Sequence, residues 1–228
     1  MKKYIIYAIA VLWIINMTAC QSIEKKPDIY RPYLKQMPVS ILILPPVNQS
    51  LDITAAYKYL SIISRPIAEK GYYVFPVAVI DALMKENGVS TPEDMHRISL
   101  SKIREIINPD AVLYVNIKEW GTKFKVIDSQ TVIHISAQLI DTDTGNKIWG
   151  NESRVVRSSV NNNNSNDIVN IIVAAMVSQV ISNFMDQTID VANEVNRNLY
   201  YNAYHGLLWG KYHPLYEKNQ KELMELKK

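Results

Sequence analysis

Apolar and polar positions in the first half of the chain alternate between two periods. Val39–Leu44 (VSILIL) is almost continuously apolar and stops at Pro45-Pro46, where two backbone donors are missing, which predicts a short strand buried on both faces. Apolar residues then recur at helical spacing over Ala56–Ile67, which predicts a helix that Pro66 kinks or restarts before Gly71 ends it. A strand therefore leads into a helix.

The rest of the first half repeats this alternation. Aromatic and β-branched runs predict strands, apolar residues at helical spacing predict helices, and a Thr-Pro-Glu-Asp sequence is typical of a helix start. In chain order these are a strand at Tyr72–Val77, a helix at Ala78–Asn87, a helix start at Thr91–Asp94, a helix at Ser99–Asn108 and a strand at Ala111–Trp120. The predicted order is β-α-β-α-α-β.

The second half changes to a period of two, which is typical of an antiparallel meander. Strands are predicted at Lys123–Ile127, Thr131–Ile140 and Lys147–Ser158, with turns at Asp128-Ser129 and Thr144–Asn146. After the uncharged polar loop Asn161–Asn166, Asp167 can cap a long helix that we expect to cover one face of the sheet. This helix is predicted to run through Ile171, Ala175, Phe184 and Ile189 towards Val195.

These elements predict an α/β (α+β) fold, a single domain in which helices pack on a mixed sheet that includes the meander. A content of 48% hydrophobic and 21% charged residues fits one globular core. The formal charge of +3 falls to +1 without Lys2 and Lys3. That charge is too small for a general polyanion binder, so nucleic acid is not expected as a partner.

Residues 1–19 have the layout of a secretory leader. Met1-Lys2-Lys3 is positively charged, Tyr4–Met17 is apolar, and Thr18-Ala19 are small. As a helix, Tyr4–Ala19 would be about 24 Å long, shorter than the roughly 30 Å of bilayer hydrocarbon. The segment is therefore predicted to be a signal peptide rather than a membrane span.

Cys20 is the only cysteine in the sequence and directly follows the leader. Met17-Thr18-Ala19-Cys20 resembles the bacterial lipobox, with Met17 where Leu is usual. The resemblance implies cleavage before Cys20, which then carries covalent diacylglycerol and an N-acyl chain such as palmitate. Gln21 stands where Asp commonly retains lipoproteins in the inner membrane, which favours the periplasmic face of the outer membrane. The alternative is a buried core cysteine behind an ordinary signal peptide.

The next segment, residues 20–37, is predicted to be a tether. It carries charges and two prolines without a sustained apolar period, and it could reach about 50 Å when fully extended. The alternative is that its second half packs on the domain through Tyr30, Tyr33 and Leu34. The folded domain is then expected over residues 38–199, followed by an aromatic tail at 200–228.

Four blocks of sequence, in order, resemble a bacterial lipoprotein family formerly catalogued as a domain of unknown function. They are SILILPPVNQS, GYYVFPVAVIDALMKENG, PDAVLYVNIKEWGT and LIDTDTGNKIW. Such proteins are similar to periplasmic α/β domains of curli-export lipoproteins and to the amino-terminal domain of TolB. The resemblance implies a non-enzymatic accessory component of an envelope export or assembly system, with a curli-export-like lipoprotein as partner. It implies no catalytic residues, and self-association stays open.

Candidate catalytic groups are sparse. The histidines lack the i, i+4 spacing of a helical zinc site, and no nucleophile elbow, P-loop or dinucleotide motif occurs in the sequence. The histidines are His96, His134, His205 and His213. We therefore predict no catalytic or cofactor-binding residues and no cofactor.

One spacing is typical of a metal site. Asp141, Asp143 and Glu152 stand at positions 1, 3 and 12 of a calcium loop. However, Gly145 and Asn146 occupy positions 5 and 6 in the reverse of the required order, and the flanking segments are predicted strands. A plain hairpin turn is favoured, and no metal ligands are predicted.

Aromatic residues crowd the carboxyl end around Gly206, Gly210 and Pro214. Such a cluster predicts either a docking patch for a partner or the bilayer interface, or a tail folded back on the domain so that it caps the long helix. The aromatic residues are Tyr200, Tyr201, Tyr204, Trp209, Tyr212 and Tyr216.

Two classes of function are compatible with these observations. The first is the non-enzymatic lipoprotein that assembles with other envelope components. The alternative is a periplasmic enzyme or small-ligand-binding protein of unknown substrate, because ligands favour the strand ends of α/β sheets. Asn48, Asp81 and Glu119 would line its cleft.

Overall fold

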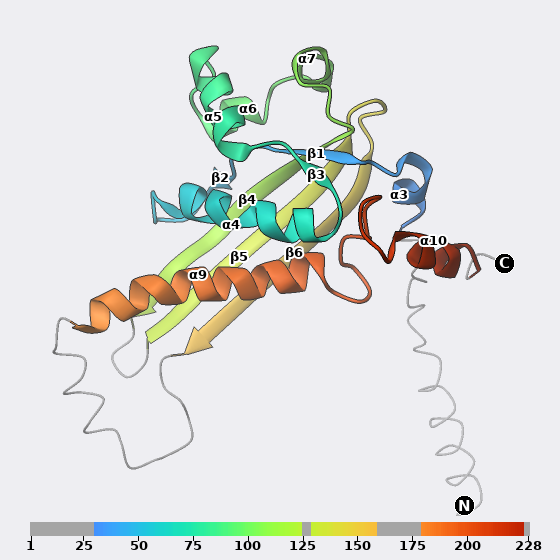
Figure 1. The fold of residues 1–228 in the computed structure, drawn as a ribbon. Coiled ribbons are helices and arrows are strands. Elements are labelled where there is room, and N and C mark those ends of the chain that lie inside the picture. The colour runs from blue at the N-terminus through green and yellow to red at the C-terminus, as the bar shows by residue number, and fades with distance from the viewer. Residues whose placement is uncertain (1–29, 125–128, 159–178, 226–228) are drawn as a thin grey trace, which may run out of the picture.

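A computed structural model describes residues 30–124, 129–158 and 179–225 of the chain (Figure 1). Its helices are α3 (Arg31–Gln36), α4 (Ala55–Glu69), α5 (Val77–Glu86), α6 (Pro92–Met95), α7 (Leu100–Ile106), α9 (Gln179–Tyr200) and α10 (Tyr216–Glu225). Its strands are β1 (Ser40–Ile43), β2 (Val47–Asn48), β3 (Tyr73–Val74), β4 (Ala111–Phe124), β5 (Ser129–Asp141) and β6 (Lys147–Ser158). The leader, Cys20, the first half of the tether, Asp128, the loop at 161–166, Asp167, Ile171 and Ala175 lie outside the described residues.

One six-stranded sheet organises the domain, in the order β3-β1-β4-β5-β6 with β2 also paired to β4. β1 runs parallel to β3 and β4, whereas β5 is antiparallel to both of its neighbours, β4 and β6. β1 and β2 pair with successive parts of β4, so Pro45-Pro46 interrupts a single line of pairing. The predicted mixed sheet with an antiparallel meander is confirmed.

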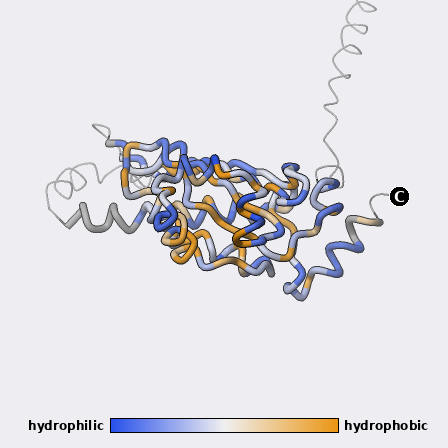
Figure 2. Tube along the Cα trace, turned by 90° about the horizontal axis from the view of Figure 1, so that it is seen from above, coloured by the Kyte–Doolittle hydropathy of each residue, from blue (hydrophilic) through white to orange (hydrophobic). Residues whose placement is uncertain are grey.

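Helices lie on both faces of the sheet and enclose two cores (Figure 1). The larger core lies between α4 and α9 and the sheet, and it contains Tyr59, Trp120 and Val195. The smaller core packs α5, α6 and α7 against the other face, for example through Met95 and Leu42. Figure 2 shows the apolar stretches concentrated in the middle of the domain and hydrophilic segments on the outside. This is the arrangement expected when burial of apolar surface drives folding.

Three strand and helix boundaries differ from prediction. β4 continues to Phe124, so the prediction of a separate strand at Lys123–Ile127 is wrong for the part that the structure describes. A bulge between Ile117 and Glu119 shifts the register, and β4 stays paired with β5 beyond it. β3 has only two residues because Pro76 precedes α5, which begins at Val77. α4 continues through Pro66, which lies in its last turn and therefore removes only one helical hydrogen bond.

The amino-terminal part of the described chain is packed, not extended. Tyr30 and Tyr33 are buried, α3 lies against β6, and Met37 ends the helix in the left-handed conformation. Tyr33 shares a hydrogen bond with the Tyr72 hydroxyl. The second half of the predicted tether thus takes the alternative arrangement, packed on the domain.

The segment after α9 also folds back onto the domain. Gly210 N–H donates to the Lys70 carbonyl at 2.7 Å, and Tyr212 N–H donates to the Gly71 carbonyl at 3.1 Å. The Tyr72 hydroxyl donates to the Leu208 carbonyl at 2.8 Å. We call these contacts between residues 70–72 and 208–213 the clasp. This part of the tail therefore folds back on the domain, as the alternative expects, but these contacts are with the segment after α4 and not with the long helix that the tail was expected to cap.

Candidate functional site

Among the described residues, the most exposed large apolar side chains lie on one loop. We call residues 49–54, between β2 and α4, the apolar loop. Leu51 is 102% exposed and Ile53 is 88% exposed, so neither side chain contributes to the domain core. An exposed pair of aliphatic side chains at one position is typical of a contact surface.

Polar side chains hold the backbone of the apolar loop in place. The Asn48 side-chain amide donates to the Asp52 carbonyl at 2.7 Å, and its oxygen accepts from Ser50 N–H at 3.0 Å. Asp52 Oδ1 accepts from both Thr54 N–H and the Thr54 hydroxyl, at 2.8 and 2.6 Å. Such local hydrogen bonds stabilise a turn. Leu51 and Ile53 are therefore presented on an ordered backbone.

An ion pair closes the same network. Asp52 Oδ2 lies 3.0 Å from the Lys58 ammonium. Burial alone would raise the pKa of Asp52, but the hydrogen bonds from Thr54 and Lys58 outweigh it and lower the pKa below its ordinary value. Because the folded pKa is lowered, this contribution to stability is present at neutral pH and is lost only as the pH falls through the folded pKa.

Lys85 links Asp81 on α5 to Tyr57 near the start of α4. Lys85 donates to Asp81 Oδ2 at 2.6 Å and to the Tyr57 hydroxyl at 2.8 Å. These two acceptors raise the pKa of Lys85, with Asp81 contributing more. The exposed ring of Tyr57 is thus held by α5 near the beginning of α4, within one turn of Ile53.

Glu119 belongs to a charged network on the outer face of the meander. Arg154 donates to Glu119 at 2.7 Å and Lys123 also pairs with it, so the pKa of Glu119 is lowered to about 2. His134 Nε2 lies 2.5 Å from Glu152, which also pairs with Lys118 at 2.7 Å. In this network three basic side chains pair with two carboxylates, and such surface pairs contribute little to stability.

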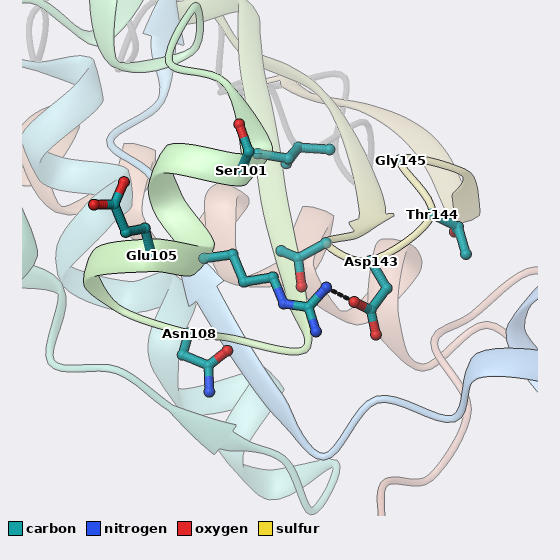
Figure 3. A pocket seen from close by; sticks show the side chains of 9 residues that line it. Ser101, Glu105, Asn108, Asp143, Thr144 and Gly145 are labelled. Atoms are coloured by element: carbon teal, nitrogen blue, oxygen red, sulfur yellow. Dashed lines mark ion pairs between the residues drawn. The ribbon is translucent and has the colours of Figure 1, made fainter.

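The three residues with calcium-loop spacing, Asp141, Asp143 and Glu152, have separate roles. Asp143 lines an open hollow of about 600 Å³ between α7 and the β5–β6 turn (Figure 3). Asp143 points towards Arg104 and pairs with it, whereas Glu105 points away. Asp141 Oδ1 accepts from Thr144 N–H at 2.8 Å and so closes the turn. Glu152 lies in the charged network instead. The segment is the hairpin turn that the sequence favours.

The other three histidines are scattered over the fold. His96 contacts the Pro45 carbonyl at 2.9 Å, and burial lowers the pKa of His96 despite that hydrogen bond. His213 stacks on Trp209, with ring centroids 3.9 Å apart, and burial followed by the charge of Lys70 lowers the pKa of His213. His205 is exposed. Within the described ranges, no three His, Cys, Asp or Glu side chains gather as a metal site would require.

The cleft expected from Asn48, Asp81 and Glu119 is not assembled. Asn48 fixes the apolar loop, Asp81 pairs with Lys85, and Glu119 pairs with Arg154. Neither the hollow beside α7 nor a second hollow over β4, β5 and β6 is lined by any of the three residues. Sequence reasoning missed Leu51 and Ile53, although the turn-forming Asn, Ser, Asp and Thr around them were a usable signal.

Comparison with known proteins identifies the family. The family described as "Putative lipoprotein GNA1162-like" matches residues 29–212. A Neisseria meningitidis protein named "Putative lipoprotein NMB1124/NMB1162" is 37% identical over 166 residues, which are 72% of this chain and 75% of that protein. The crystal structure of lipoprotein GNA1162 from Neisseria meningitidis superposes with a TM-score of 0.52 at 34% identity, covering 64% of this chain and 99% of that one.

Within the residues that the structure describes, no helix has both the length and the apolar character of a membrane span. The lipoprotein family that the four sequence blocks indicate is confirmed by the family match and by the curated relative. This chain belongs to the GNA1162-like lipoprotein family.

Proposed function

We propose that this protein is a lipid-anchored accessory of an envelope export or assembly system, held by acylated Cys20 at the periplasmic face of the outer membrane. It acts by contacting another envelope protein and not by catalysis. Membership of a lipoprotein family and the lipobox-like sequence support the anchor. A curli-export-like lipoprotein is the partner that the sequence resemblance favours.

The apolar loop is the observation that carries the contact function. Leu51 and Ile53 expose aliphatic surface that would be stabilised by burial, at about 25 cal/mol for each Å² removed from water. The loop backbone is already ordered by Asn48 and Asp52, so binding would cost little conformational entropy.

The position of the apolar loop suits this role. Figure 1 shows α3 and α10 at one end of the domain and the start of α4 at the other. The segment that leads to Cys20 joins the first of these ends, at Tyr30. An anchored domain would therefore present the apolar loop away from the attachment point, where a partner in the periplasm can reach it.

The anchor predicts a specific chemical change at Cys20. Mature protein purified from membranes is expected to begin at Cys20 and to carry acyl mass there, whereas Cys20→Ala should remain unprocessed or be released from the membrane fraction. Intact-mass spectrometry of fractionated membranes measures both. A mature wild-type protein without lipid, free in the periplasm, would exclude the anchor.

The contact surface predicts a loss of partner capture. Leu51→Asp with Ile53→Asp is expected to weaken recovery of the crosslinked partner from intact envelopes at least about tenfold, because two apolar anchors become charged. Ile106→Asp is the matched control, since Ile106 is an exposed aliphatic residue on α7. Both variants should unfold at the wild-type temperature. Equal recovery from both variants would contradict the assignment of the contact to the apolar loop.

A further inference from the structure

The first packed residue after the tether is bonded directly to the carboxyl-terminal segment. The Tyr30 hydroxyl donates to the Gly206 carbonyl at 2.5 Å and lies 3.2 Å from the Tyr204 carbonyl. Residues 21–29 separate Tyr30 from Cys20. The ten Cα–Cα steps from Cys20 to Tyr30 span about 33 Å when the chain is fully extended. The segment around Tyr204 is thus confined to the neighbourhood of whatever holds Cys20.

This segment exposes aromatic side chains. Tyr204 is 70% exposed, Tyr212 is 67% exposed, and Leu215 next to them in sequence is also exposed. They differ from Tyr200, which is buried against Trp149 in the core. The tail therefore has an inner side, which packs, and an outer side with tyrosines that the domain leaves uncovered.

The backbone that carries these tyrosines is fixed. The Asn202 side-chain oxygen accepts from Tyr204 N–H at 2.8 Å, and Tyr212 N–H belongs to the clasp. On the inner side, the Lys70 ammonium lies 3.7 Å from the centroid of the Trp209 ring, a cation–π contact that holds the segment against α4. The exposed rings are presented at little further cost in conformational entropy.

The charged side chains within the two segments that carry and adjoin the tyrosines are basic, and one carboxylate contacts them from α4. Residues 31–37 and 201–215 contain the basic residues Arg31, Lys35 and Lys211 and no carboxylate. The carboxylate that contacts this segment from α4 is Glu69, which accepts from the Tyr201 hydroxyl at 2.8 Å and from Arg65 at the same distance. Tyrosines flanked by basic side chains are typical of surfaces that lie at the headgroup level of anionic bilayers.

From this juxtaposition we infer that Tyr204, Tyr212 and Leu215 dock the domain onto the bilayer that holds Cys20, with Lys35 and Lys211 facing anionic headgroups. The inference rests on the proposed lipid anchor, which keeps the segment within reach of the membrane. The docked domain would have a defined orientation, with the tail against the lipid and the apolar loop facing the periplasm.

A single-site probe tests the docking. Because Cys20 is the only native cysteine and is consumed by lipid, Ala203→Cys in the full-length, lipidated protein can be labelled alone with a polarity-sensitive fluorophore. Ala82→Cys, an exposed alanine on α5, is the matched control. In vesicles of phosphatidylethanolamine and phosphatidylglycerol, brominated lipid should quench the probe at 203 but not at 82. Adding Tyr204→Ser and Tyr212→Ser should abolish the quenching without changing the unfolding temperature.

The outcomes separate the docking from the anchor. If the protein floats with the vesicles but neither probe is quenched, the anchor stands and the docking is wrong. If the protein does not float and Cys20 carries no acyl mass, both are wrong. If the probe at 203 is shielded from a water-soluble quencher in native envelopes but not in protein-free vesicles, the tyrosines contact a protein, which overturns the lipid assignment.

Discussion

Replacing Gly71 by alanine is expected to lower the free energy of unfolding by about 3 kcal/mol. Gly71 has φ +86°, a left-handed conformation that costs a residue with a Cβ roughly 1–2 kcal/mol. A Cβ there would also lie 2.4 Å from the His213 backbone nitrogen, so the clasp would have to open or shift, and such overpacking costs about 1–3 kcal/mol. Urea denaturation followed by circular dichroism measures the change.

Gly88→Ala is the matched control for this prediction. Gly88 has nearly the same backbone conformation, with φ +83°, but no heavy atom lies within 4 Å of the Cβ it would gain. It should therefore lose only the roughly 1–2 kcal/mol that the left-handed conformation costs. The difference between the two variants measures the close contact between Gly71 and the tail. Equal losses would contradict the prediction, because the close approach of His213 to Gly71 would then cost nothing.

The clasp links the ends of the chain to the proposed function. Gly71 and Tyr72 receive the tail, and Tyr33 of α3 bonds to the same Tyr72 hydroxyl. The tether end and the tail are therefore both held by the short segment between α4 and β3. A variant that opens the clasp should also release Tyr212, so that lipid docking and stability would fall together.

The hydrophobic pattern predicts the middle of the fold well. β1 is apolar and buried at the three positions after Ser40 because helices cover both of its faces, and β5 and β6 alternate because one face of the meander is exposed. These are direct consequences of burial, so they are visible in the residues themselves. β2 and β3 have two residues each, and their pairing is set by β4 and β1 rather than by their own side chains.

Long-range contacts set the limits of prediction. α3 has six residues, too few for a stable isolated helix, and it depends on burial of Tyr33 in the main core. Glu119 is paired across two strands with Arg154, a contact that depends on the bulge in β4. The prediction of Glu119 at a cleft failed because the strand register cannot be read from the local sequence.

Exposure was equally invisible in the sequence. Leu51 and Ile53 alternate with polar residues, a pattern that elsewhere in this chain indicates a half-buried strand. Here the flanking Asn48 and Asp52 close a turn and direct the backbone away from the core. The local hydrogen bonds that produce this arrangement could be anticipated by residue type, but the sequence does not show that the described helices and strands leave these two side chains exposed.

Alkaline solution is expected to unfold the protein cooperatively between pH 10 and 12. Burial raises the pKa of Tyr30 to about 12 and the pKa values of Tyr33, Tyr59 and Tyr72 above their ordinary value of 10. Burial favours the neutral hydroxyl over the tyrosinate. The contribution of a buried tyrosine to the free energy of unfolding is therefore complete below pH 10 and is lost as the pH rises through the folded pKa. The ionisation of Tyr30 alone lowers the free energy of unfolding by about 1.4 kcal/mol for each pH unit in this range.

The measurement follows tyrosinate absorbance and far-ultraviolet circular dichroism on the same samples, and the two transitions should coincide for the buried tyrosines. Tyr72→Phe tests the cause. It removes one buried ionisable hydroxyl together with its hydrogen bond to Leu208, so it should lower stability at neutral pH by about 1–2 kcal/mol while making the alkaline loss less steep. Gradual tyrosinate formation with an unchanged dichroism spectrum would show that these hydroxyls reach water without unfolding. An unchanged steepness in Tyr72→Phe would mean that Tyr72 does not ionise in the transition.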